Sequence, residues 1–479
     1  MSDKIAIFVT VKQQVNDINL ALSGLLYELK ELRGTIDSQH AEICSLNRNI
    51  DKLLKENREL RKRLEKYEKP PKDSGNSSIP PSKEPVKSEM ERRTKSLRKK
   101  SDKSVGGQPG HEGTTRKMVA TPDEIENASS QFCTECGRDL SDVDGVLDYV
   151  IQEIDLPPIK PIYRERRFYK KVCACGCCNR DYAPRKRGGN AITFGKNIRA
   201  AATYLNVVQC MPYERLQSLF ETMFNVRVSQ GTLANIVREM LDKSRPAIEL
   251  IERLLKESAV VGFDESGCYV NGKLNWSWIA QTTYLTLVFR GAGRGAKVLE
   301  ERFGDSLKNM IAVTDRHSAY FAIDFLNNQI CLAHLLRNLE YLNDIDKEQT
   351  WARDVQTLLR EAIHLRNEKP ADIIPKGNWL TRLDGLLKKN LDNLRKEFNE
   401  LKRGIIKCRD YIFNFLENPA IPSDNNGSER GIRKLKVKQK ISGFFRSDTG
   451  ADAFHALHSI ADTAWKNGQY PLDAILALA

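Results

Sequence analysis

The chain has 479 residues, 40% of them hydrophobic, so it is too long for one ordinary domain and apolar enough for several cores. Its formal net charge of +13 favours a polyanionic partner such as nucleic acid. No apolar run reaches the length of a membrane span, and the run at residues 5–9 is too short for a secretory signal, so we expect a cytoplasmic protein with no membrane partner.

The first predicted element is a coiled coil over residues 12–68. β-Branched residues in one seam and leucine in the other favour a parallel two-stranded coil, and Asn57 in the first seam fixes the register. We therefore expect a homodimer; the alternative is a long helix packed against its own chain. The first seam contains Leu22, Leu29, Ile36, Ile43, Ile50, Asn57 and Leu64, and the second contains Leu25, Leu32, Leu46, Leu53 and Leu60, with Gln39 as its exception.

A basic flexible linker is predicted over residues 69–118. This stretch is rich in Pro, Ser, Gly, Lys and Arg and has too few large apolar residues to form a core. The basic run at residues 92–103 fits a solvated linker, contact with the DNA backbone, or both.

Cysteine spacing predicts a zinc-binding domain over residues 119–187. The first pair, Cys133 and Cys136, has the spacing of a zinc knuckle. The second knuckle offers four thiols for two places, and we choose Cys175 and Cys178 because they keep the same spacing. Cys173 and Cys177 are the substitutes, and the alternative to zinc is a set of reduced structural thiols. A structural zinc would hold together a segment that is too small to fold on its own core.

Residues 188–257 have a helical period and are predicted to form a helix-turn-helix-like DNA-binding domain. Helices are expected over 198–207 and 213–224, and a third begins near Ser229 and runs through Leu241. Two helices, a short turn and a helix that begins with polar residues are typical of this motif. Small helical packing domains share the pattern, so DNA contact and simple packing both stay open.

Residues 258–345 and 416–479 are predicted to form the two parts of an α/β core. Three meandering strands are followed by helix, strand, helix and strand, which is the layout of a ribonuclease-H-like fold. The charged stretch 346–415 is predicted to be a helical insertion. The fold class is therefore multidomain α+β. The strands are expected from residue 260 to Asp264, over 276–280, 284–289 and 310–314, and over 329–332, with a short helix over 297–303.

Three acidic residues stand at the edges of apolar or capping segments. Asp264 and Asp315 end predicted buried strands, and Glu429 lies in the first turn of a helix that Asp424 would cap. A buried carboxylate is costly to leave unpaired, so a group of three fits divalent cations. Sites with two such cations act in displacement at phosphorus, which in a basic chain is most simply that of nucleic acid. For any single acid the alternative is a surface carboxylate.

These residues resemble the transposases of the insertion sequence 66 family, which are bacterial DDE enzymes, over almost the full length of the chain. Gly427-Ser428 stand where a His-Ala or similar pair is common before the glutamate, with the spacing unchanged. The shared motifs are the N-terminal coil, residues 74–78 and 106–111, the double cysteine knuckle, Asp264-Glu265-Ser266, Thr314-Asp315, residues 331–337, Asp424-Asn425-Asn426 and Glu429-Arg430.

The resemblance implies a transposase of a bacterial insertion sequence, associated with the nucleoid, that binds terminal inverted repeats and catalyses DNA strand cleavage and strand transfer. By motif position it assigns Asp264, Asp315 and Glu429 as the catalytic triad and as ligands of two Mg²⁺ ions, for which Mn²⁺ would substitute. It also implies a ribonuclease-H-like core, target DNA as a second partner, and possible accessory proteins of the same element.

Four further residues are predicted to support the reaction by contacting DNA phosphate. His334 and Arg337 lie one helical turn apart, and the family motif favours phosphate contact over the ordinary role of a core histidine. Arg430 and Arg433 follow the glutamate on a basic helix. Such a face is usually only solvated, but beside a metal site it is well placed for the DNA backbone.

Two other functions compete with this one. A non-catalytic zinc-containing DNA-binding regulator derived from a transposase would explain the charge and the cysteines, but not three retained acids. A metal-dependent nuclease without strand transfer would use the same site.

Overall fold

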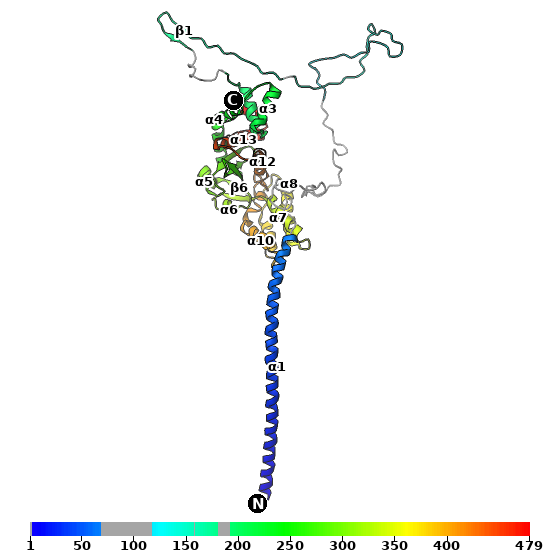
Figure 1. Ribbon diagram of the computed structural model, residues 1–479, viewed down its shortest axis with the longest axis vertical. Helices are drawn as coiled ribbons and strands as arrows, with labels where there is room; N and C mark the ends of the chain where they lie inside the picture. The colour runs from blue at the N-terminus through cyan, green and yellow to red at the C-terminus, as the bar shows by residue number, and fades with distance from the viewer. Residues whose placement is uncertain (1, 69–116, 158, 181–191) are drawn as a thin grey trace. The chain divides into compact units, whose positions relative to one another are not determined.

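The computed structural model describes residues 2–68, 117–157, 159–180 and 192–479 (Figure 1). The chain divides into two units, one formed by residues 1–72 with a short piece at 344–347 and the other by the remainder, and each is described by itself. The predicted linker lies outside the described residues except for Lys117 and Met118, and so does the end of the predicted zinc-binding domain, 181–187. No helix in the described ranges is long and apolar enough to cross a membrane.

The N-terminal unit is one helix, α1 (Ser2–Glu68). Its predicted seams are exposed to solvent. Every seam leucine and isoleucine whose side chain is described is at least 51% exposed. Leu64 lies among the helix residues whose side chains are not described. A helix of this length with an uncovered apolar seam fits a coiled-coil partner, so the coil and the homodimer stay predictions.

The region from Lys117 to Arg180 has little regular structure in its described part. Two short strands, β1 (Lys171–Val172) and β2 (Cys178–Asn179), form an antiparallel hairpin. Large apolar residues there are mostly exposed, for example Leu147 and Tyr163. The described part of this segment therefore shows no core of its own.

Three helices follow: α2 (Lys196–Val207), α3 (Tyr213–Phe224) and α4 (Gln230–Lys256). The Ser229 hydroxyl caps α4 by accepting a hydrogen bond from the Thr232 N–H over 3.1 Å. This helix runs well beyond the predicted end at Leu241, with Pro246 inside it. Buried residues of all three helices join a core that also contains sheet residues and the C-terminal helices, so this segment packs as part of the larger unit.

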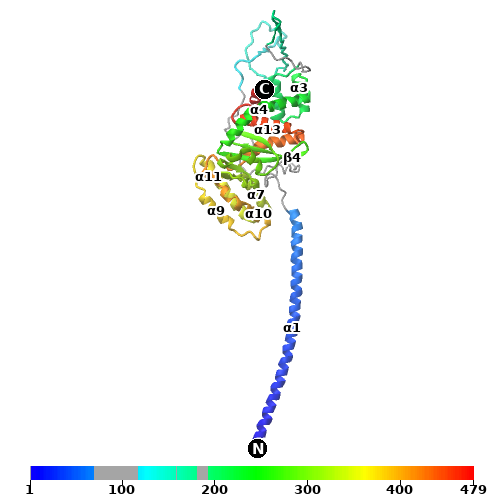
Figure 2. The same ribbon diagram turned by 90° about the vertical axis from the view of Figure 1, so that its left-hand side faces the viewer.

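A five-stranded mixed sheet has the order β5-β4-β3-β6-β7. Strands β3, β4 and β5 are antiparallel neighbours, whereas β6 and β7 run parallel to β3 (Figure 2). A mixed α+β fold is therefore confirmed. The strands are β3 (Val260–Val270), β4 (Lys273–Gln281), β5 (Thr286–Gly291), β6 (Ile311–Thr314) and β7 (Asn327–Ile330).

One strand prediction was wrong in its length. The first strand of the core, β3, does not end at Asp264 but continues to Val270. The reason is its antiparallel neighbour: β4 pairs with β3 as far as Val270, whereas parallel β6 pairs only with residues 260–262. A local apolar run predicts only the part of the strand that is continuously apolar.

Helices cover both faces of the sheet. On one face, Phe263 and Trp278 pack with α5 (Lys297–Phe303) and with Tyr320 of α6 (Ser318–Phe321). On the other, Ile279 and Val288 pack with α12 (Asn426–Ser442) and α13 (Asp448–Lys466). A 3-10 turn, η2 (Gly304–Asn309), precedes β6, and α14 (Pro471–Leu478) closes the chain.

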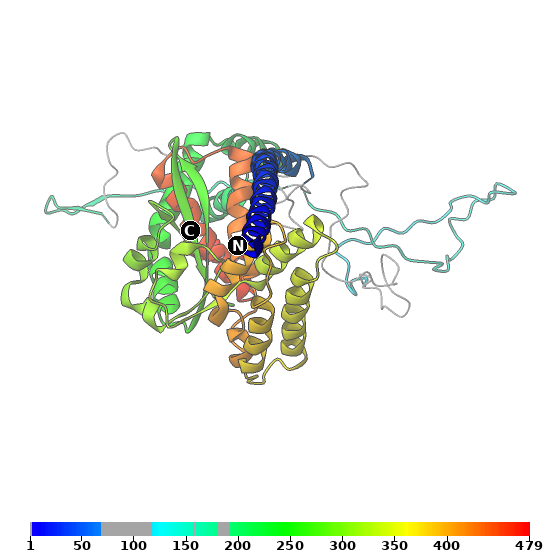
Figure 3. The ribbon, with the colours of Figure 1, turned by 90° about the horizontal axis from the view of Figure 1, so that it is seen from below.

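The predicted helical insertion between the second and third acids is present as helices. After α7 (Leu332–Ile345) come α8 (Trp351–Glu368), α9 (Gly377–Leu387), α10 (Lys396–Lys407), η3 (Arg409–Tyr411) and α11 (Asn414–Glu417). Helices α8 and α9 lie side by side (Figure 3). Trp351, Leu383 and Phe398 are buried among them.

Candidate active site

Asp264 and Asp315 lie at the end of the parallel pairing between β3 and β6. The last paired residues are Gly262 and Val313, so both aspartates stand two residues further along neighbouring strands. Parallel strands are about 4.8 Å apart, which brings the two carboxylates into the same neighbourhood. Asp264 points to the face that α12 covers, because side chains alternate along a strand and Phe263 packs on the opposite face.

The charge of Asp315 acts on the Asp264 carboxylate. Burial, followed by the charges of Glu265 and Asp315, raises the pKa of Asp264 to about 8. Asp315 is held by its own turn: its Oδ1 accepts a hydrogen bond from the His317 N–H over 2.8 Å. Neither aspartate forms an ion pair with any residue in the described part of the chain. Two close carboxylates without a cationic partner are a donor set that fits a divalent cation.

Glu429 lies in the first turn of α12, and the start of this helix is anchored on β3. The Asn425 side-chain amide donates to the Phe263 carbonyl over 2.7 Å, and the Ser428 hydroxyl donates to Asn425 Oδ1 over 2.6 Å. A Cβ atom at Gly262 would lie only 2.7 Å from Ser428 Oγ. The sequence predicted that a helix starts here, and these contacts show how that start is held on β3.

The predicted N-cap of this helix was wrong by one residue. The N-cap is Asn425, and α12 begins at Asn426. Asp424 still supports the helix start, because its Oδ1 accepts a hydrogen bond from the Asn426 N–H over 2.9 Å. Helix ends often shift by a residue when several capping side chains stand in a row.

Two glycines of α12 allow the helix to lie close to β4. A Cβ atom at Gly427 would be 2.2 Å from the Gln281 amide nitrogen, and one at Gly431 would be 2.3 Å from Ile279 Cδ1. Gly427-Ser428, which depart from the common pair before the glutamate, are therefore explained by packing. Gly427 leaves room for Gln281, and Ser428 completes the anchor on Asn425.

His334 and Arg337 of α7 both reach Glu429. Arg337 Nη2 donates to Glu429 Oε1 over 3.3 Å, and His334 Nδ1 lies 3.5 Å from the same oxygen. Burial and the charge of Arg337 lower the pKa of His334 to about 4, so the imidazole is neutral near pH 7. Its buried Nδ1 has no hydrogen-bond partner among the described residues. Of the two predicted phosphate-contacting residues, Arg337 therefore forms a hydrogen bond with the third acid in this structure, and His334 lies beside it.

The sequence assigned no role to Cys331, which lies beside these residues. Ligand atoms of Cys331, His334 and Glu429 all lie within 4.8 Å of one another, the one such group of potential metal ligands within the described ranges. The Cys331 sulfur accepts a hydrogen bond from the Asn425 N–H over 3.1 Å, and burial raises its pKa to about 12. A protonated thiol anchors the start of α12; cation binding would require loss of that proton.

The structure thus brings Asp264 and Asp315 close enough to interact electrostatically, whereas the three acids do not form a close group of metal ligands in the described part of the chain. The charge of Asp315 acts on His334, which in turn lies against Glu429. Basic residues of α12 are close as well: the charge of Lys436 acts on Asp264, while Arg430 and Arg433 are exposed to solvent. Contact of these arginines with DNA stays a prediction.

The two cysteine knuckles have similar turns. Gly137 follows Cys136 with φ of 72°, and Gly176 follows Cys175 with φ of 85°, both in the left-handed region that favours glycine. Hydrogen bonds from the backbone of Cys136 and Glu135 lower the pKa of the Cys133 thiol.

In the second knuckle, hydrogen bonds from the backbone of Cys177 and from the Cys173 and Cys177 side chains lower the pKa of the Cys175 thiol. Cys178 lies in β2, opposite Val172. The four thiols predicted to bind zinc do not form a close group of ligands in this structure.

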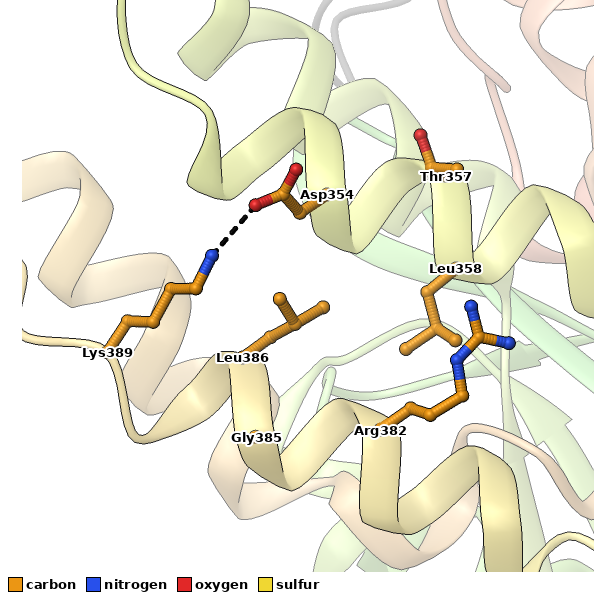
Figure 4. A pocket seen from close by; sticks show the side chains of 7 residues that line it. All are labelled: Asp354, Thr357, Leu358, Arg382, Gly385, Leu386 and Lys389. Atoms are coloured by element: carbon orange, nitrogen blue, oxygen red, sulfur yellow. Dashed lines mark hydrogen bonds and ion pairs between the residues drawn. The ribbon is translucent and has the colours of Figure 1, made fainter.

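A shallow pocket of about 450 Å³ lies between α8 and α9, within the insertion (Figure 4). Asp354 and Lys389 face each other across it and form an ion pair of 2.9 Å, and Arg382 lies at its other end. None of the three acids lines it. This pocket therefore supplies surface residues that serve as controls for the site.

Comparison with known families gives two matches. A family model described as Transposase IS66 family matches residues 191–453, which is more than half of the chain and includes all three acids. A second model, described as a family of unknown function (DUF6444), matches residues 30–117. A comparison with curated proteins found no match.

Proposed function

Because the chain belongs to the IS66 transposase family, we propose that it cuts and joins DNA with Asp264, Asp315 and Glu429 as its catalytic acids. The sheet order, with antiparallel β3–β5 and parallel β6 and β7, supports a ribonuclease-H-like core for this chemistry. The substrates are the terminal inverted repeats of the element and a target DNA.

The observation that carries the proposal is the Asp264–Asp315 pair. Burial and the charges of Glu265 and Asp315 raise the free energy of the charged Asp264 carboxylate, and this effect outweighs the positive charge of Lys436. Asp264, Asp315 and Glu429 would hold Mg²⁺, with Mn²⁺ as a substitute. When bound, such ions favour attack on phosphorus and stabilise the leaving oxygen.

The chain's own residues prepare the site. Arg337 forms a hydrogen bond with the Glu429 carboxylate, neutral His334 lies beside it, and the anchored start of α12 fixes its backbone relative to β3. Lys436, Arg430 and Arg433 supply positive charge along the same helix, where the DNA backbone would lie. A covalent protein–DNA intermediate is not needed, because the nucleophiles are water and then the freed 3′-hydroxyl of the DNA.

The proposal also includes a homodimer and a structural zinc site. The bare seam of α1 supports a homodimer. The paired knuckles support one structural zinc, with Cys133, Cys136 and Cys175 as ligands and either Cys178 or Cys173 as the fourth. Accessory proteins of the same element are possible further partners.

A non-catalytic DNA-binding regulator is the second candidate. The observation in its favour is the pairing of Glu429 with Arg337, since a carboxylate that already has a cationic partner has less need of a metal ion.

One experiment separates the candidates. Purified protein is incubated with labelled element ends, a target plasmid and Mg²⁺, and the products are resolved on denaturing gels. Joined products support the transposase, cut but unjoined ends a nuclease, and a mobility shift without cutting the regulator. Asp264→Asn, Asp315→Asn and Glu429→Gln are the matched variants. Each should bind DNA and fold but not cut, and full cleavage by any of them removes that residue from the site.

A further inference from the structure

Arg316 follows Asp315 directly, and neither the sequence motifs nor the proposed chemistry gives it a role. Its side chain is partly buried, and this burial lowers the pKa of its guanidinium. Within the described part of the chain it forms no hydrogen bond and no ion pair. A guanidinium carries five N–H donors and stays charged, so a partly buried guanidinium without a hydrogen-bond or ion-pair partner has donors free for a ligand.

Helix α10 of the insertion makes room for this side chain. A Cβ atom at Gly404 would lie 2.9 Å from Arg316 Nη1. Gly404 stands inside α10, between the buried residues Leu401 and Ile405, where glycine destabilises a helix relative to alanine. The arginine therefore lies against the one backbone position of α10 that has no side chain.

The guanidinium also lies near the acidic site. The charge of Arg316 acts on His334, and the charge of Asp315 acts on Arg316. His334 is the residue that lies against Glu429. A positive, unpaired group is thus present beside the second and third acids, on the side of the site that the insertion covers.

We propose that Arg316 binds a phosphate of the DNA strand that enters the acidic site, with α10 as the wall that holds the guanidinium in place. The proposal rests on the proposed function, because that function brings a phosphodiester to these acids. Phosphate is the chemical class that fits, since a guanidinium matches two oxygens of one phosphate and remains charged at every working pH. The helical insertion then has a direct part in substrate binding.

Neutral DNA linkages test the contact. A series of labelled element ends is made in which one phosphate at a time, close to the cleavage point, is replaced by an uncharged methylphosphonate. Binding and cleavage are measured for wild type, Arg316→Gln and Arg316→Lys. For wild type, the methylphosphonate at one position should weaken binding by about 10- to 100-fold, which is the range for loss of a hydrogen bond to a charged group. In Arg316→Gln the same replacement should have no further effect, and Arg316→Lys should be intermediate.

Arg382→Gln is the matched control, because Arg382 is an exposed arginine of the insertion that lines the pocket between α8 and α9. It should keep the wild-type pattern at every position. If Arg316→Gln keeps that pattern as well, the proposal is overturned.

A second variant tests the same contact if Arg316→Gln does not fold. Gly404→Ala adds a methyl group beside the guanidinium and should displace it, so that sensitivity to the same methylphosphonate falls. Gly385→Ala in α9 is its control, because a Cβ atom there meets nothing within 4 Å. Unchanged sensitivity in Gly404→Ala would count against the proposal.

Failure of the proposed function gives a different result. If wild type binds element ends but never cuts them, the catalytic proposal fails, and the binding half of the scan still decides the role of Arg316.

Discussion

Arg337 Nη2 lies 3.3 Å from Glu429 Oε1, and this hydrogen bond joins residues 92 positions apart in the chain. The same oxygen is 3.5 Å from His334 Nδ1, and both residues come from α7, which begins directly after β7 and Cys331. Because the start of α12 is anchored on β3, α7 and β3 together determine where the third acid lies.

Loss of Arg337 should impair cleavage through the position of Glu429. We expect Arg337→Ala to lower the cleavage rate by about 10- to 100-fold, and to raise the Mg²⁺ concentration needed for half-maximal rate, since a hydrogen bond to a charged group is lost. Arg337→Lys should be intermediate because lysine keeps the charge but lacks the planar fork. Arg382→Ala should cleave as wild type does. Equal rates and equal Mg²⁺ dependence for Arg337→Ala would contradict a positioning role.

Stability without metal should fall as pH rises, because of Asp264. The pKa of this carboxyl is raised from 3.8 to about 8 in the folded protein. The folded state then binds more protons than the unfolded state between these values, so the free energy of unfolding decreases as pH rises toward and through about 8. Asp264→Asn cannot lose a proton, so it should melt like wild type below pH 3.8 but at a higher temperature than wild type at pH 8.5.

Thermal melting in EDTA and in Mg²⁺ checks this. Mg²⁺ favours the charged carboxylate, so it should raise the melting temperature of wild type at pH 8.5 and have a smaller effect on Asp264→Asn. Parallel melting curves for the two proteins across pH would show that Asp264 is not the titrating group.

Close packing of α12 on β4 should not tolerate a methyl group at Gly431. Gly431→Ala would place Cβ 2.3 Å from Ile279 Cδ1, and we expect a loss of about 1–3 kcal/mol of stability as for overpacked cores. Ile279→Val removes that Cδ1 atom, so the double variant should recover part of the loss. Urea denaturation measures all three. A double variant no more stable than Gly431→Ala would disprove this contact as the cause.

Zinc content should identify the ligands of the two knuckles. We expect one zinc per chain, lost in Cys133→Ser, Cys136→Ser and Cys175→Ser. Sequence spacing favours Cys178 as the fourth ligand, whereas the turn geometry favours Cys173, because Gly176 follows Cys175 as Gly137 follows Cys136. Metal analysis of Cys173→Ser and Cys178→Ser decides between them. Retention of zinc by all of the single variants would leave the cysteines as structural thiols.

The seam of α1 should hold two chains together. Ile36 is 61% exposed on the isolated helix, and a lysine there would place charge within a coiled-coil interface, so Ile36→Lys should sediment as a monomer. Leu20 is also exposed but stands outside both seams, so Leu20→Lys should remain a dimer. A wild-type chain that sediments as a monomer at all concentrations would refute the predicted homodimer.

Much of the core could be predicted from local patterns. The short apolar runs before Asp264 and Asp315 gave the positions of β3 and β6, and the polar residues at 424–426 gave the start of α12 to within one residue. The end of β3 could not be predicted, because residues beyond Asp264 are held in the strand by antiparallel pairing with β4. The contact of Gly431 with Ile279 could not be predicted from the sequence either, since it joins segments far apart in the chain.

Spacing along the chain was sufficient to single out three acids, two cysteine knuckles and a heptad seam. Each of these patterns can be recognised within a short segment of the sequence. Tertiary structure alone decided which side chain forms a hydrogen bond with Glu429 and why positions 427 and 431 are glycine. It also decided that Arg316 lies against Gly404 without an ion-pair partner among the described residues. The physical reason is that these features depend on contacts between distant segments. Their energies come from close packing and from burial of charge, which no local pattern records.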